Sequence, residues 1–154
     1  RAAVMAQSGQ YNNARAMKRG EKVAAKLALA EFMKSAISMV YLLNRRYAPF
    51  YKWMRHGMKE LSVLPEIGDI LDLLAGLEDQ SPAWEGVGET DYLYTLNGND
   101  QCVLIVEAVC NLIVQELAAQ GLTKGEDNFL ESHTMALMEK IKDPYIRSLH
   151  VMEG

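Results

Sequence analysis

Residues 21–44 read EKVAAKLALAEFMKSAISMVYLLN, and this stretch decides the fold class. It contains no Gly or Pro and is rich in Ala, a composition that favours one long helix. Apolar residues surround most of the circumference of that helix, so we expect it to lie inside a core rather than on a surface. The stretch therefore predicts a helical protein with this segment at its centre.

Helix signals continue on both sides of this stretch, and strand signals are nearly absent. Upstream, residues 1–17 predict a helix that ends near Gln7, followed by a polar loop, QSGQYNNAR. Downstream, Pro residues, caps and apolar spacing predict further helices. These are 49–61 after Pro49, one from about Pro65, a short one near 82–86 within the long connection 79–99, 100–120 capped by Asn99 or Asp100, 129–142 after Asn128 and Glu131, and a last one after Asp143–Pro144.

This pattern predicts an all-α fold, an up-and-down bundle of about five to seven helices. The chain has 154 residues, enough for one domain that spans 1–154, and we expect the helices 21–44 and 100–120 to be core partners. Because the chain opens on Arg1, without a leader-like segment, we expect it to be the C-terminal part of a longer protein.

The longest apolar runs are broken by Glu31 and Glu107, so neither predicts a membrane span, and we expect a cytoplasmic protein. Cys102 and Cys110 would stand about 12 Å apart along one helix, at about 1.5 Å per residue, which excludes a disulfide between them. Buried, reduced thiols fit a cytosolic protein. No His lies at ligand spacing beside either Cys, so no zinc or other metal is expected.

Charge is divided unevenly along the chain. Residues 1–59 hold 12 of the 16 Lys and Arg, whereas residues 60–154 hold 18 of the 20 Asp and Glu. Either the two parts pack together and neutralise each other, or the basic part faces an anionic partner. Composition leaves both interpretations open.

The densest group of cations and aromatic residues is 42–53, LLNRRYAPFYKW. Arg45 and Arg46 follow the long helix, and Lys52 lies in the next one. A guanidinium forms a planar fork that matches phosphate or carboxylate, and Tyr47 and Tyr51 offer rings for stacking. The segment thus predicts an anion-binding site, in which the residues expected to bind substrate or nucleotide are Asn44, Arg45, Arg46, Tyr47, Tyr51 and Lys52. In the alternative interpretation, one of the two arginines caps its own helix and pairs with an acid from the second part.

Other motifs indicate little chemistry. At helical spacing Phe50, Trp53 and Met54 share one face, which we expect to be core. The chain has no phosphate-binding GxxxxGK[ST] or GxGxxG loop, and we assign no catalytic residue. His133 follows a loop and precedes an apolar face, so it is a further candidate for substrate or nucleotide binding.

Four segments resemble one known family: QSGQYN (7–12), LALAEFMKSAISMVYLLNRRYAPFYKW (27–53), FLESHTMALMEKIKD (129–143) and RSLHVMEG (147–154). The family is a helical domain of unknown function that follows a nucleotidyltransferase domain in bacterial and archaeal proteins. It is similar to the helical substrate-binding domains of antibiotic nucleotidyltransferases and to HEPN-type bundles. The most specific segment of the resemblance begins at Asn44 and continues through Tyr47 to Trp53.

The resemblance implies an accessory domain that binds substrate or nucleotide beside an upstream nucleotidyltransferase domain. The catalytic Gly-Ser motif and acidic pair of such a domain are absent from this chain, so the chain alone is not expected to transfer nucleotides. A nucleoside triphosphate with magnesium is expected only in the missing domain, and no cofactor in this chain. By the resemblance, Arg45, Arg46, Tyr47 and Lys52 face the cleft of that domain.

Two alternatives remain. One is a non-enzymatic interaction bundle, in which the charge asymmetry drives homodimer formation. The other is a HEPN-type ribonuclease, but no Arg precedes a His at the spacing that those enzymes use.

Overall fold

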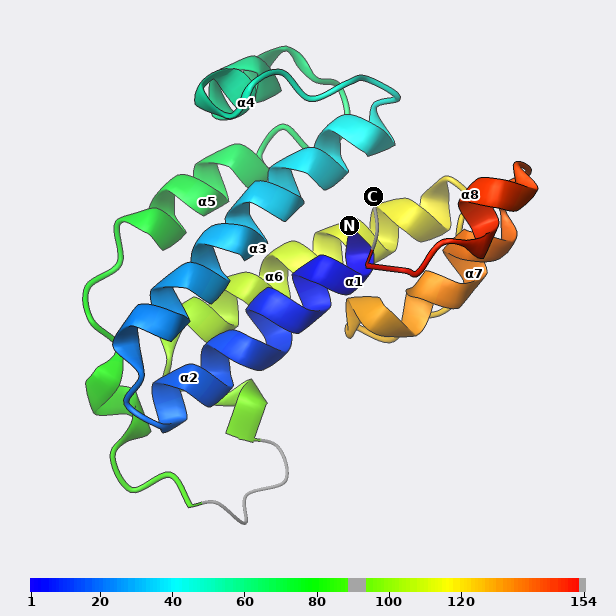
Figure 1. Ribbon diagram of the computed structural model, residues 1–154. Helices are drawn as coiled ribbons and strands as arrows, with labels where there is room; N and C mark the ends of the chain where they lie inside the picture. The colour runs from blue at the N-terminus through cyan, green and yellow to red at the C-terminus, as the bar shows by residue number, and fades with distance from the viewer. Residues whose placement is uncertain (89–93, 153–154) are drawn as a thin grey trace.

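The computed structural model describes residues 1–88 and 94–152, and every regular element in those ranges is a helix (Figure 1). The all-α prediction is therefore confirmed. The α-helices are α1 (Ala2–Met5), α2 (Ala14–Lys18), α3 (Lys22–Leu43), α4 (Tyr51–Gly57), α5 (Ile67–Ala75), α6 (Gln101–Ala119), α7 (Thr134–Glu139) and α8 (Pro144–Ser148). A π-helical segment spans Ala6–Asn13, and 3-10 turns span Met58–Glu60, Ser81–Trp84, Tyr94–Leu96 and Leu130–His133.

Residues 2–18 form one continuous helix, in which the π-helical segment joins α1 to α2. The chain then reverses at Gly20, whose φ of 72° suits a residue without a Cβ, and α3 returns antiparallel (Figure 1). The predicted end near Gln7 and the predicted polar loop are wrong. Three polar side chains of this segment, Ser8, Gln10 and Asn13, are buried instead. The Ser8 hydroxyl donates to the Val4 carbonyl (2.6 Å), and Asn13 Nδ2 donates to the Ala25 carbonyl (3.1 Å).

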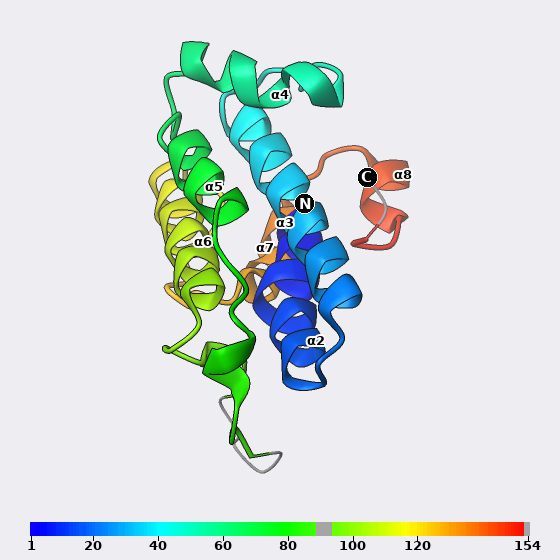
Figure 2. The ribbon, with the colours of Figure 1, turned by 90° about the vertical axis from the view of Figure 1, so that its left-hand side faces the viewer.

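One core unites the long helices. Phe32 and Val40 of α3 lie fully buried with Val109 and Ile113 of α6, which confirms that both predicted helices contribute to the core. Figure 2 shows α5 and α6 side by side next to α3. The predicted cap of α6 is also confirmed, because the Asp100 carboxylate accepts hydrogen bonds from the first-turn amides.

The predictions for the other helices are partly confirmed and partly wrong. The turn at Ser81–Trp84 matches the short helix predicted near 82–86, while residues 89–93 of that long connection lie outside the described ranges. Asp143 caps α8 as predicted. The capping box at Asn128 is wrong: the Asn128 amide donates to Glu107 on α6 instead, and the helix expected over 129–142 is a 3-10 turn followed by the short α7.

α6 is long and apolar enough to cross a membrane by length and composition alone. Four of its apolar residues, Val106, Val109, Ile113 and Val114, nevertheless lie in the bundle core, and Glu107 near its middle is hydrogen-bonded to the π-helical segment. The core position accounts for the apolar composition of this helix, as in the central helices of soluble bundles.

α4 lies across the end of α3, at the top of Figures 1 and 2. The connections on its two sides, 44–50 and 61–66, contain no regular helix. The segment that the sequence singled out is therefore at one end of the bundle rather than along its side.

Candidate functional site

The C-terminus of α3 ends in a Schellman motif that places two arginines on the surface. The Arg46 amide donates to the Tyr41 carbonyl (3.0 Å) and the Arg45 amide donates to the Leu42 carbonyl (2.9 Å). Arg45 occupies the left-handed position of this motif, with a φ of 56°, where glycine is the usual residue. Arg45 thus places a long cationic side chain on a backbone conformation that disfavours residues with a Cβ.

Asn44, which the sequence predicted as a binding residue, holds two segments of backbone together. Its Nδ2 donates to the carbonyls of Val40 (2.8 Å) and Val63 (2.9 Å), and its Oδ1 accepts from the amides of Ser62 (3.1 Å) and Val63 (2.9 Å). These bonds use both ends of the amide. Asn44 therefore fixes the segment after α4 against the end of α3, and so positions the residues around it.

Aromatic side chains are exposed on and before α4. Tyr47 is fully exposed, and Phe50, Tyr51 and Trp53 are each more than 60% exposed. The expectation that Phe50 and Trp53 lie in the core is wrong; only Met54 of that face is buried. The Phe50 and Tyr51 rings lie 4.6 Å apart, tilted by 54°. We call this group, together with Arg45, Arg46 and Lys52, the basic-aromatic surface.

The cations of the basic-aromatic surface lack ion-pair partners. Within residues 1–88 and 94–152, no side-chain hydrogen bond or ion pair involves Arg45, Arg46 or Lys52. Of the two charge interpretations, internal pairing is thus observed at some positions of the basic part, and the anionic partner stays a prediction. The basic part does pair with the acidic part through Lys22, which contacts Asp79 at 2.6 Å, but not at this surface.

Arg55, which lies on α4 with Lys52, differs from these cations because it forms ion pairs. Its guanidinium contacts the carboxylates of both Asp69 and Asp72 on α5 at 2.6 Å. The hydrogen bond from Arg55 holds the pKa of Asp72 below its ordinary value. Arg55 therefore anchors α4 to α5. A second anchor is the buried Tyr41 hydroxyl, which donates to the Met54 carbonyl (3.0 Å).

His133 lies apart from the basic-aromatic surface; it is the last residue of the 3-10 turn that precedes α7, and its side chain is buried. It is only 2% exposed. Its Nε2 lies 2.6 Å from the Asp127 carbonyl and its Nδ1 lies 2.8 Å from the Thr123 hydroxyl. A carbonyl only accepts, so Nε2 carries the proton and Nδ1 accepts from Thr123. Both ring nitrogens are used within the protein, and the structure does not bring His133 together with the other predicted residues.

A polar cluster that the sequence did not single out lies between the π-helical segment and α6. Gln10 Nε2 donates to both carboxylate oxygens of Glu107 (3.1 Å each) and to the Asn128 carbonyl (2.9 Å), and Gln10 Oε1 accepts from the Leu130 amide (3.0 Å). Burial raises the pKa of Glu107 above its ordinary value. The sequence feature that could have indicated this cluster is the acidic residue Glu107 within the apolar run of α6.

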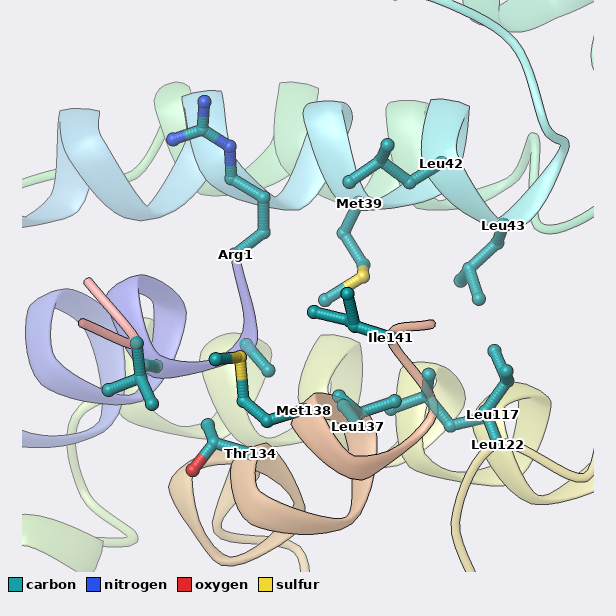
Figure 3. A pocket seen from close by; sticks show the side chains of 13 residues that line it. Arg1, Met39, Leu42, Leu43, Leu117, Leu122, Thr134, Leu137, Met138 and Ile141 are labelled. Carbon is teal, nitrogen blue, oxygen red and sulfur yellow. The ribbon is translucent and has the colours of Figure 1, made fainter. Parts of the chain in front are cut away.

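An apolar pocket of about 300 Å³ lies between α1, the C-terminal ends of α3 and α6, and α7 (Figure 3). Figure 3 shows Met39, Leu122 and Ile141 among its walls and the Arg1 side chain extending toward α3. Its one hydroxyl, from Thr134, already donates to the Glu131 carbonyl (2.7 Å). The pocket contains none of the predicted site residues and few groups that could orient a polar ligand.

The thiols and acids form no metal site in the described ranges. Cys102 and Cys110 are free, and burial raises the pKa of both thiols, to about 11 for Cys102. No group of three or more His, Cys, Asp or Glu residues that could hold a metal ion occurs among the residues the structure describes. The chemistry available at the basic-aromatic surface is recognition by charge and stacking.

Comparisons with known proteins give one family match. Residues 1–54 match a family described as Domain of unknown function (DUF4037). Neither the curated proteins nor the solved structures contain a match to this chain. The matched range begins before α1 and ends within α4, so it includes the whole basic-aromatic surface.

Proposed function

We propose that this chain is an accessory binding domain whose basic-aromatic surface recognises an anionic small molecule. The class of ligand that we propose first is a nucleoside triphosphate. The observation that carries the proposal is that, among the residues the structure describes, none forms an ion pair with Arg45, Arg46 or Lys52, in contrast to the doubly paired Arg55 of the same region. Cations that remain unpaired beside an acidic partner segment are available for an external anion.

The side chains of the surface suit a nucleotide in two ways. Two guanidinium groups present planar sets of donors that match phosphate oxygens, and a neighbouring ammonium adds charge. Tyr47 and Tyr51 expose rings on which a base can stack, an interaction that contributes about 1–3 kcal/mol per base in proteins that bind single strands. Asn44 fixes the backbone from which these groups extend.

The resemblance to domains that follow a nucleotidyltransferase supports a division of labour. In this proposal a separate catalytic domain holds the nucleoside triphosphate with magnesium and performs the transfer, and the present chain contributes contacts to nucleotide or acceptor. No catalytic residue is assigned here, and the family match by itself names no activity.

A second candidate is self-association through the same surface. The exposure of Phe50 and Trp53 favours it, because contiguous exposed aromatic groups are typical of protein interfaces. A dimer formed in this way would cover the rings that a nucleotide needs for stacking.

The test is a calorimetric titration of the chain with ATP, with and without magnesium, together with its molar mass by light scattering. The Arg45→Ala/Arg46→Ala variant should bind at least tenfold more weakly, because charge-assisted hydrogen bonds contribute about 1.5–3 kcal/mol each. The matched control is Lys140→Ala/Lys142→Ala, which removes the same charge from exposed positions beyond α7. Equal losses in both variants, or a monodisperse dimer without ATP binding, would contradict the nucleotide proposal.

A further inference from the structure

The apolar pocket beside α1 is larger than an ordinary packing void. Its volume of about 300 Å³ lies between α1, α7 and the C-terminal ends of α3 and α6. Folded proteins contain few internal voids larger than one water molecule. An apolar cavity of about 150 Å³ already stays dry and binds apolar molecules, because water inside it finds no hydrogen-bond partners. The pocket is therefore large enough to hold a ligand.

The walls of the pocket present alkyl groups and few polar atoms. They include Met39 of α3, Leu117 of α6 and Ile141 after α7. The Thr134 hydroxyl also lines the pocket, but its proton is donated to the Glu131 carbonyl (2.7 Å). A polar ligand would lose its hydrogen bonds to water in this space and regain few of them. An alkyl chain loses none.

The pocket is open to solvent along α3. Leu42, one of its walls, is 58% exposed. Ala2 and Ala3 of α1 line it with side chains that end at Cβ, so they leave the space unfilled. Transfer of apolar surface out of water is favourable in proportion to the area covered. An alkyl chain can therefore enter along Leu42 while the core stays folded.

One end of the pocket has a positive charge. Figure 3 shows Arg1 at one end of the labelled side chains, Leu43 and Leu122 at the other, and Met39 and Ile141 between them. Among the described residues that line the pocket, Arg1 is the only one with a charged side chain, and none of the residues described forms an ion pair with it. The complement to this arrangement is an alkyl chain that ends in an anion.

We infer that this pocket binds a medium-chain fatty carboxylate, with the alkyl chain against the walls and the carboxylate on the Arg1 guanidinium. A guanidinium presents parallel N–H donors that match the two oxygens of a carboxylate. An alkylammonium would be repelled at the same end. The inference goes beyond the proposed nucleotide binding, because the basic-aromatic surface contributes none of the described residues that line this pocket.

The probe is octanoate, added at millimolar concentration to protein that is isotope-labelled at the methionine methyl groups and followed by NMR. Met39 and Met138 line the pocket, whereas Met58 is fully buried in the 3-10 turn after α4. We expect octanoate to shift the signals of Met39 and Met138 and to leave that of Met58 in place. Butanoate should bind more weakly, by about fourfold for each methylene group removed.

A substitution at Arg1 tests the contribution of charge. Arg1→Gln should weaken octanoate binding about fivefold, as expected for an exposed ion pair, and should leave the binding of neutral 1-octanol unchanged. Arg19→Gln removes the same charge from the C-terminal end of α2 and should leave both affinities unchanged. Both arginines are exposed, so we expect both variants to fold, and thermal unfolding checks this.

Absence of shifts at Met39 and Met138 in the wild type would overturn the inference without reference to any variant. An equal shift at Met58 would also overturn it, because octanoate would then bind without preference for the pocket. Equal weakening in the two variants, or octylammonium binding as tightly as octanoate, would show that Arg1 does not select an anion. Nucleotide binding is measured with the Arg45 and Arg46 variants, so the two proposals succeed or fail separately.

Discussion

Arg45 provides a sharp test because two substitutions separate its backbone from its side chain. In the Schellman motif it has a φ of 56°, a conformation that glycine adopts freely and that other residues adopt at a penalty. Arg45→Gly removes both the guanidinium and the Cβ, whereas Arg45→Ala removes the guanidinium and keeps the Cβ. Any difference in stability between the two variants therefore comes from the Cβ, through the left-handed backbone of the folded state and the freedom of glycine in the unfolded chain.

The magnitude follows from two opposing effects. Both variants lose a cation at the C-terminus of α3, an interaction worth about 0.3–1 kcal/mol. Only glycine escapes the left-handed penalty of about 1–2 kcal/mol, and part of that gain is offset by its greater freedom in the unfolded chain. We expect the glycine variant to be more stable than the alanine variant by about 1 kcal/mol, or about 2–4 °C in Tm for a protein of this size.

Urea unfolding followed by far-ultraviolet circular dichroism measures this difference, with equal m-values as the check that the unfolded states match. ATP affinity should fall equally in both variants, since neither retains the guanidinium. The same pair at Arg46, whose φ is not positive, is the control, and there glycine should be the less stable of the two. If glycine and alanine at position 45 gave equal stability, Arg45 would not hold the left-handed conformation in solution, and the reasoning would be refuted.

Three further predictions follow from buried contacts. Asn44→Ala should lower the free energy of unfolding by about 2 kcal/mol or more in urea titration, because the amide and carbonyl of Val63 lose their partner; an unchanged midpoint would contradict this assignment. Gly9→Ala should lower it by about 1–3 kcal/mol, because the new Cβ would stand 2.3 Å from the Phe32 ring; a stabilised variant would show that the π-helical segment relaxes freely. Burial raises the pKa of Glu107, so the folded state holds its proton to higher pH than the unfolded state, and stability should fall as pH rises from the ordinary glutamate pKa through the raised value. Glu107→Gln should lack that component when the two pH profiles are compared, and identical profiles would contradict the shift.

Local chemistry made part of the fold predictable from sequence. The uninterrupted apolar stretch 21–44 identified α3, and the carboxylates of Asp100 and Asp143 identified the starts of α6 and α8. In each case the deciding interaction lies within a few residues of the signal. A cap or a helical period requires no knowledge of distant residues.

The errors come from contacts between distant segments. Gln10 and its neighbours are polar and were assigned to a loop, but their partners include Glu107 and the Asn128 carbonyl, about a hundred residues away. Asn128 was assigned to a capping box for the same reason. A polar side chain within a helix can be buried when a distant residue supplies its hydrogen-bond partner. The spacing of residues along the chain does not indicate where that partner is.

The candidate site was found in composition but not in detail. The cluster of cations and rings at 45–52 correctly located an exposed surface, whereas Phe50 and Trp53 were expected inside because their spacing matched Met54. Which face of a short helix is covered depends on whether a neighbouring element reaches it. For α4 these neighbours are α3, the 3-10 turn Met58–Glu60 and, through Arg55, α5, and the sequence did not indicate how little of α4 they cover.

The way α4 is attached has a consequence for motion. Its contacts with the rest of the bundle are concentrated in the Tyr41 hydroxyl, the buried Met54 and the Arg55 pair with α5, and irregular segments flank it on both sides. A unit with so few anchors can open while the core remains folded, so its amides should exchange with solvent faster than those of α3 or α6. Substitutions on the basic-aromatic surface should then have little effect on the global stability of the bundle. A ligand that bridges α4 to the end of α3 would slow the amide exchange of α4.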